Sequence, residues 1–485
     1  MQQVESAAFR GCYFGSGSTL LSKGIYLDSI LATVDSETYV NPYIELAMRK
    51  RSDTMPANLR ERYDQLIAEH LSPAHKLAAG LRALPGEREA FASTQGAWRF
   101  FCNENTTLPQ IFEPVLTYVR EQVGLTCEQY VLVPCDWCNL HYKNHESKKG
   151  RVALANSKDL GYETFNGLAL SDNNGQPIGP LWMELRDAQG VHSTHDHFVR
   201  EPLSVLDEVI GNMRFTTGLR LSKLPVFIID TESDSIAHLR LWFAEGMKYL
   251  VRCKAQHAAK YEGKSHSLAE IGELLKQSNQ FTFAREVEFE GRQVQQWVAE
   301  TPIVITRPAR PKRKGEPRKD VPGPPLELQL VVSELRDEAG EVVAVWYLET
   351  NVESSVDKAT IVLWYYWRWR IESYHKLLKS DGQHIESWRQ ESGEAIARRL
   401  AVASMACVLV WRIQRDPSEE AERVRKVLIR LSGRQMSRKR PATAPALLAG
   451  MWVLLASLDM LQSYDIEFLQ ECAMYAKHLI AGNTV

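Results

Sequence analysis

Residues 365–379 read YYWRWRIESYHKLLK, and no other stretch of the chain restricts its chemistry as strongly. On one continuous helix, Tyr365, Arg368, Glu372 and Lys379 would share a face about 60° wide. That face sets one carboxylate among two cations and a phenol. A carboxylate ligates hard cations, whereas Arg and Lys neutralise phosphate oxygens. The stretch therefore predicts a site that handles a metal ion and a phosphate together.

An ordinary surface helix is the alternative interpretation, because Arg368 and Glu372 also have the spacing of a simple i,i+4 ion pair. The aromatic content of this stretch is high for a solvated face. Trp364, Trp367 and Trp369 flank the polar stripe, and we expect them in the core.

Two aspartates elsewhere in the chain end short apolar runs. Asp136 ends YVLVPCD at residues 130–136, and Asp230 ends VFIID at residues 226–230. Buried parallel strands read as continuous apolar runs, and neighbouring parallel strands would bring the two aspartates together. Each alone is more often a strand-end turn residue. Together with Glu372, they supply enough carboxylates for two Mg²⁺ ions about 3.5–4 Å apart.

The spacing Tyr-x2-Arg-x3-Glu-x6-Lys is similar to the signature of the bacterial DDE cut-and-paste transposases of the insertion-sequence-four family. Residues 95–101, QGAWRFF, resemble the DNA-binding segment of that family, and residues 249–254 resemble the strand after its second Asp. Trp346 and Thr350 resemble a Trp-x3-Thr element. The resemblance covers roughly residues 55–485.

The resemblance implies an RNase H-like catalytic domain whose three carboxylates hold two Mg²⁺ ions, with Mn²⁺ able to replace them. It also implies that Trp346 stacks a base flipped out of the duplex. The catalytic and metal-binding residues would be Asp136, Asp230 and Glu372. The residues implied or proposed to contact DNA phosphates are Tyr365, Arg368, Lys379, Arg252, Lys254 and Arg99.

Cut-and-paste DNA transposition is the activity that the resemblance implies. The protein would bind inverted-repeat ends, pair them as a homodimer, nick, form hairpins and join the element to target DNA. One alternative is a DDE nuclease without strand transfer, and another is a catalytically silent DNA-binding descendant. A two-carboxylate hydrolase of sugars is a third, but it leaves Arg368 and Lys379 unexplained.

The expected fold class is α/β, with an RNase H-like domain, an antiparallel β insertion and helical domains on both sides. We expect an unassigned extension at 1–54, a helical domain that binds DNA ends at 55–122, a catalytic domain at 123–392 with its insertion at about 256–342, and a C-terminal helical domain at 393–485. The last domain would dimerise, or it would simply cover the catalytic domain. Within the catalytic domain we expect strands near 130–135, 166–171, 180–185, 226–229 and 249–254, and helices near 202–214 and 234–245.

Composition is that of an ordinary globular protein, with 44% hydrophobic residues and a formal net charge of −2. That charge does not by itself indicate a nucleic-acid binder. Basic residues nevertheless cluster at 49–51, 307–320 and 438–440. The chain shows neither a signal peptide nor an uninterrupted apolar run of about 18 residues, so we expect no membrane contact and a cytoplasmic location, at the nucleoid when DNA is bound.

Two further groups of metal-binding residue types have ordinary interpretations. Cys135 and Cys138 form a lone CxxC motif without a second pair, so reduced thiols are expected rather than zinc. His192, His195 and His197 are expected on an exposed loop. Thr107 is expected to cap the helix that follows it.

Overall fold

The computed structural model describes residues 55–71, 95–231, 235–310, 320–434 and 442–482. Three predicted features lie wholly or mostly outside the described residues: the extension at 1–54, the basic clusters at 49–51 and 438–440, and most of the basic cluster at 307–320.

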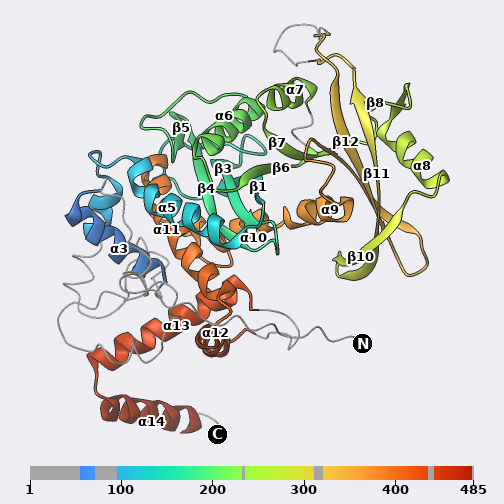
Figure 1. The fold of residues 1–485 in the computed structure, drawn as a ribbon. Coiled ribbons are helices and arrows are strands. Elements are labelled where there is room, and N and C mark those ends of the chain that lie inside the picture. The colour runs from blue at the N-terminus through green and yellow to red at the C-terminus, as the bar shows by residue number, and fades with distance from the viewer. Residues whose placement is uncertain (1–54, 72–94, 232–234, 311–319, 435–441, 483–485) are drawn as a thin grey trace, which may run out of the picture.

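One mixed sheet runs through the molecule in the order β5-β4-β3-β1-β6-β7-β13-β12-β11-β8-β9, with β10 beside β11 and β2 beside β3 (Figure 1). The predicted mixed α/β class is confirmed. The strands are β1 Tyr130–His141, β2 Val152–Ala153, β3 Leu160–Ser171, β4 Pro177–Asp187, β5 Gly190–Ser193, β6 Leu224–Ile229, β7 Lys248–Cys253, β8 Ala258–Tyr261, β9 Lys264–Ser267, β10 Thr282–Phe289, β11 Arg292–Ile305, β12 Leu326–Arg336 and β13 Val342–Thr350.

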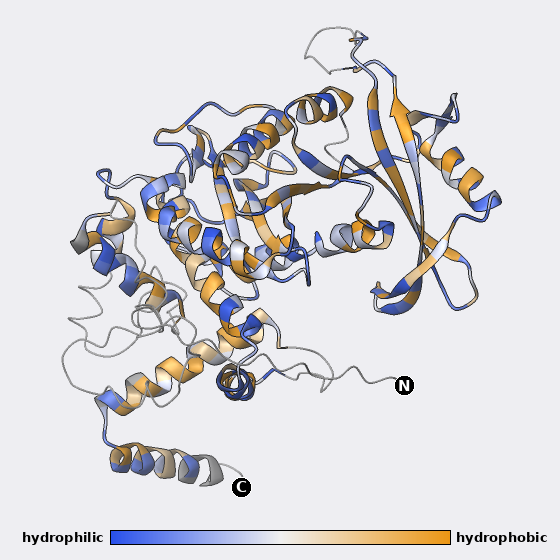
Figure 2. Ribbon diagram, viewed as in Figure 1, coloured by the Kyte–Doolittle hydropathy of each residue, from blue (hydrophilic) through white to orange (hydrophobic). Residues whose placement is uncertain are grey.

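Helices pack against this sheet, and α5 and α11 both contact β4. Thr107 caps α5 through a capping box with Gln110, as predicted. The long helix α11 is buried along most of its length and contacts α3, α5, α13 and β4; Figure 2 shows its hydrophobic character. The helices are α3 Ala57–Leu71, α5 Leu108–Thr126, α6 Val205–Gly218, α7 Ile236–Ala244, α8 Leu268–Gln277, α9 Lys358–Trp367, α10 Arg370–Leu378, α11 Gly393–Arg415, α12 Glu419–Leu431, α13 Ala444–Ser463 and α14 Ile466–Gly482.

Strand β1 is longer than the apolar run predicted, and Asp136 lies inside it rather than after it. The parallel pairing of β1 with β6 ends at Pro134 and Ile228. The antiparallel pairing of β1 with β3 continues to His141. Asp136 is therefore held by β3 on one side, just where β6 stops and Asp230 follows it.

The strands between β7 and β13 extend the central sheet rather than forming a separate one. Antiparallel pairing of β7 with β13 joins them, and β10, β11, β12 and β13 pair antiparallel in turn. Helix α9 lies between the central strands and the long strands of this insertion (Figure 1). Arg285 of β10 donates to Ala359 O at 2.5 Å, and the Tyr366 hydroxyl donates to Glu288 O at 3.2 Å. The insertion thus supports the helix that leads into the signature. The domain boundaries themselves stay predictions.

One helix among the described residues, Ala444–Gln462 in α13, is long and apolar enough to cross a membrane, and 29% of that window is buried. A core helix of a soluble protein passes the same test, so this helix is weak support for a membrane span.

The prediction of an exposed loop was wrong for two of the three histidines. His192 is buried and lies 3.0 Å from Asp187. His195 lies 3.6 Å from Glu184 and 2.9 Å from the Asn212 side chain. His192 is thus held by a residue of the neighbouring strand, His195 is held by a residue of α6, and of the three only His197 is exposed.

The charge cluster around His195 predicts a pH-dependent stability. Burial alone would lower the pKa of His195, but hydrogen bonds to Asp196, Glu184 and Asn212 outweigh it and raise that pKa to about 9. Its contribution is therefore complete below about pH 6.5 and is lost as the pH rises through 9. Between these limits we expect the free energy of unfolding of the wild type to fall by about 2–3 kcal/mol more than that of His195→Gln.

Urea denaturation at both pH values measures this difference, with the exposed His197→Gln as the matched control. Equal pH dependence in the wild type and in His195→Gln would show that the charged imidazole does not stabilise the fold.

Candidate active site

Three carboxylates converge on one buried guanidinium at the junction of β1, β6 and α10. The Arg368 nitrogens lie 3.8 Å from Asp136 Oδ2, 3.1 Å from Asp230 Oδ2 and 3.2 Å from Glu372 Oε1. The Arg368 side chain is only 4% exposed, whereas the carboxylates are each about a third exposed. The structure thus brings together the three acidic residues that the sequence predicted, although they are far apart in the chain.

The electrostatics of the three carboxylates differ. Burial is the largest influence on Asp136 and raises its pKa to about 6 against the opposing effect of Arg368. Burial likewise raises the pKa of Glu372. For Asp230, burial acts to raise the pKa, but Arg368 and hydrogen bonds from Thr231 outweigh it and lower that pKa. Asp136 and Glu372 therefore ionise less readily than free carboxyl groups. A further cation beside them would favour their charged forms.

The signature stretch is two helices and not one, which corrects the wheel used for prediction. Arg368 N–H donates to Tyr365 O at 3.0 Å and Ile371 N–H donates to Arg368 O at 3.1 Å. These three-residue bonds tighten the chain between α9 and α10. Trp364 is buried as expected, but Trp369 is 51% exposed because it occupies the N-cap of α10 at this turn.

Tyr365 orients Asp230 rather than facing solvent. Its hydroxyl donates to Asp230 Oδ1 at 3.1 Å, and burial raises its pKa to about 12. Trp346 of β13 meets the Tyr365 ring edge-on at 5.6 Å and is itself buried, so it supports that ring in this arrangement. The role of Trp346 as a platform for a flipped base stays a prediction.

Lys379 does not join the carboxylates. It lies just beyond α10, with ψ at −121°, because the helix ends at Leu378. Its ammonium donates to Asn139 O at 2.8 Å and pairs with Glu386 at 3.1 Å. Lys379 therefore ties the end of α10 to β1, and its expected place on a shared helix face was wrong.

The remaining predicted phosphate contacts are dispersed. Arg252 on β7 lies 3.8 Å from Asp230 and is 40% exposed, so it belongs to the site. Lys254 is exposed just past the end of β7, and Arg99 is exposed on the helical segment at 95–101.

Sequence reasoning missed a buried polar pair that connects β3 to α10. Asn166 pairs with Asp136 in the β1–β3 register, and its side chain donates to His375 Nε2 at 3.1 Å. Burial lowers the pKa of His375 to about 4, so the ring is neutral and accepts this bond. A lone Asn in an apolar strand was the only available signal. The pair holds α10 over the strand that carries Asp136.

The donor chemistry of the site fits hard divalent cations. Among the described residues no three His, Cys, Asp or Glu side chains form a ready-made metal cluster. The three carboxylates instead share the positive charge of Arg368. Oxygen ligands carrying several negative charges around a cation are the set that Mg²⁺ prefers. Cys135 and Cys138 are free thiols outside this set.

Carboxylates from two neighbouring parallel strands and a facing helix define a class of site suited to metal-assisted phosphoryl transfer. Residues 145–409, more than half of the chain, match the family described as Transposase DDE domain. The chain belongs to that family. The matched range includes Asp230 and Glu372 and begins after Asp136.

Among solved structures, the chain is similar to the piggyBac transposase in a synaptic complex with hairpin DNA, with a TM-score of 0.35 and 10% identity over 93% of this chain and 82% of that one. A similarity this weak supports no conclusion about function. No curated protein matches the chain.

Proposed function

We propose that this protein is a cut-and-paste DNA transposase of the insertion-sequence-four type, built on an RNase H-like domain. The convergence of Asp136, Asp230 and Glu372 on Arg368 is the observation that carries the proposal. Strand order supports the domain assignment, because β4, β3 and β1 are antiparallel neighbours and β6 and β7 follow parallel to β1.

Each residue of the site has a task in this proposal. Asp136, Asp230 and Glu372 would hold two Mg²⁺ ions, which Mn²⁺ can replace. Bound ions would activate the attacking water or 3′-hydroxyl and stabilise the leaving oxygen. Tyr365 fixes the orientation of Asp230. Arg368 balances the carboxylates.

Arg252 is the exposed cation beside Asp230, and it would neutralise a phosphate of the strand being cut. Hairpin formation, with Trp346 receiving a flipped base, would require the Trp346 ring to become accessible.

DNA ends and a second copy of the chain are the proposed partners. The N-terminal helical part, which includes Arg99, would bind the inverted repeats. Met474 and Tyr475 on α14 are 69% and 67% exposed, and such apolar exposure suits an interface between protomers. The alternative is that these helices only pack within one chain. The expected location is the cytoplasm, at the nucleoid on DNA.

Incubation of the protein and Mg²⁺ with a plasmid that carries its own gene and flanking DNA tests the function. We expect a discrete fragment to be excised and, with target DNA present, joined products to appear. Cut but never joined DNA would indicate a nuclease without strand transfer. Specific binding without cutting would indicate a silent descendant and contradict the proposal.

A further inference from the structure

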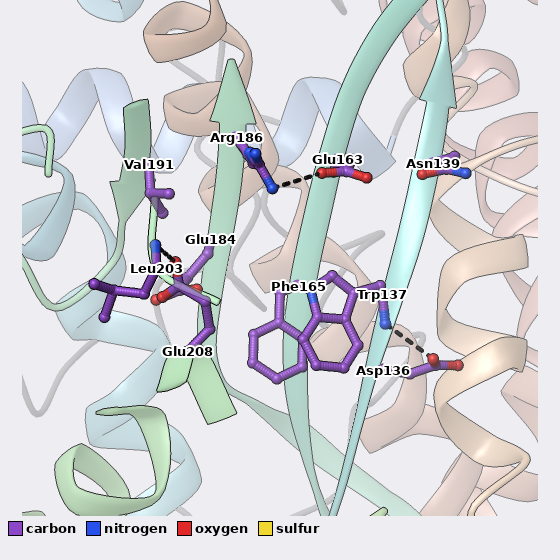
Figure 3. A pocket seen from close by; sticks show the side chains of 10 residues that line it. All are labelled: Asp136, Trp137, Asn139, Glu163, Phe165, Glu184, Arg186, Val191, Leu203 and Glu208. Carbon is purple, nitrogen blue, oxygen red and sulfur yellow. Dashed lines mark hydrogen bonds and ion pairs between the residues drawn. The ribbon is translucent and has the colours of Figure 1, made fainter. Parts of the chain in front are cut away.

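A pocket of about 350 Å³ opens beside Asp136, on the sheet surface formed by β1, β3 and β4 (Figure 3). Its floor carries Trp137 and Phe165, which are cross-strand partners, and Glu184, which is the partner of Phe165 on β4. Asp136 borders one side and Leu203, ahead of α6, borders the other. The pocket therefore borders the site of the carboxylates at Asp136.

Two stacked aromatic rings form the floor of this pocket. The Trp137 and Phe165 rings lie 3.9 Å apart at an angle of 9°. Phe165 is buried, and its ring meets Trp182 at 6.1 Å and 64°. Gly167 allows this support, because a Cβ there would come within 2.0 Å of the Trp182 ring. Trp137, which is only partly buried, thus presents a flat and well-supported surface.

The carboxylates of the pocket walls are paired with guanidinium groups. Arg200 pairs with Glu184 at 2.6 Å and also with Glu208, and both carboxylates are buried. Arg186 lies 3.4 Å from Glu163 nearer the surface. Each of Glu163, Glu184 and Glu208 thus has a guanidinium partner, which offsets part of the negative charge that a nucleotide would meet. Hydrogen-bond donors and acceptors surround a flat apolar floor, which is what a base requires.

We propose that this pocket holds one unpaired nucleobase, stacked on Trp137, of a DNA strand that passes the carboxylates. The inference rests on the proposed function, since it assumes that DNA crosses this site. The backbone N–H of Trp137 donates to Asp136 Oδ1 at 2.9 Å, which fixes the carboxylate beside the strand position that carries the platform. Asp136 itself lines the pocket, so a DNA strand held at the carboxylates passes the rim of the pocket that Trp137 floors. Stacking there offsets the loss of stacking in the duplex.

Binding of short duplexes in EDTA tests the proposal without any cutting. The probes are a blunt duplex and duplexes with a 5′ or a 3′ overhang that contains 2-aminopurine. We expect Trp137→Leu to weaken binding of one overhang probe by about 5- to 100-fold, from the usual contribution of a stacked base. Binding of the blunt duplex should not change. Trp137→Phe should retain both the binding and the quenching of 2-aminopurine that Trp137→Leu loses.

Two further variants separate this role from damage to the fold. Leu203→Trp adds bulk at a half-exposed rim position, so it should fold normally and still exclude the overhang. Phe283→Leu removes an exposed aromatic ring from β10, outside the pocket, and is the matched control. Wild-type binding by both Trp137→Leu and Leu203→Trp would overturn the proposal, as would an equal loss in Phe283→Leu.

The polarity of the overhang distinguishes two sources of the base. Preference for the 3′ overhang indicates the strand that carries the reacting hydroxyl, and preference for the 5′ overhang indicates the opposite strand. Failure of the proposed function has a separate result. A wild type that excises its element while Trp137→Leu binds overhangs normally disproves only the base pocket. If Trp137→Leu weakens overhang binding as expected but the wild type never cuts DNA, only the transposase proposal is disproved.

Discussion

Glu372→Gln is expected to abolish metal-dependent DNA cutting and to leave DNA binding unchanged. The substitution keeps the size of the side chain but removes a negative oxygen ligand from the set of three. Losing several kcal/mol of charge stabilisation at the reacting phosphate corresponds to a rate decrease of at least about 10³-fold. The side chain is 30% exposed in the first turn of α10, so the fold should tolerate the amide.

Plasmid cutting measured over time, together with gel-shift binding of the excised ends, checks this expectation. Glu391→Gln is the control, because Glu391 is a 58% exposed carboxylate in a long 3.7 Å pair with Lys149. Cutting by Glu372→Gln at the rate of that control would remove Glu372 from the chemistry and with it the three-carboxylate assignment.

The three carboxylates were predictable because each lies beside a stretch of sequence whose local pattern is recognisable. Asp136 and Asp230 follow apolar runs, and apolar runs become adjacent buried strands. Glu372 lies in a stretch whose spacing is specific. What local sequence does not contain is the tertiary partner. A helical wheel placed Arg368 on a face with Glu372, but its burial among all three carboxylates depends on how α10 docks onto β1 and β6.

The errors have the same origin. The wheel assumed a regular helix through residue 379, whereas the tight turn at Arg368 and the end of α10 move Lys379 toward Asn139. Strand β1 was predicted too short because its second half is stabilised by β3 alone, without the apolar run that marks a strand buried between two neighbours. Trp137 was missed because its stacking on Phe165 depends on the register of two strands.

Arg368→Met is expected to make the stability of the protein depend on divalent metal. The substitution removes the buried cation and leaves three carboxylates facing one another. Because those carboxylates are about a third exposed, we discount the usual cost of an unpaired buried charge to about 2 kcal/mol in EDTA. Cutting should fall as well. Arg370→Met, at an exposed position two residues on, is the matched control.

Thermal unfolding in EDTA and across a Mg²⁺ titration measures the effect. In the wild type a divalent ion must compete with the guanidinium for the same carboxylate oxygens. In Arg368→Met the three carboxylates repel one another, and a bound divalent ion relieves that repulsion. A ligand that binds the folded state raises its stability with the logarithm of the ratio of ligand concentration to dissociation constant. Mg²⁺ should therefore raise the melting temperature of Arg368→Met more than that of the wild type or of Arg370→Met. An equal rise in all three would mean that Arg368 and the metal do not share a site, and the carboxylates would then have to bind metal on a side away from the guanidinium.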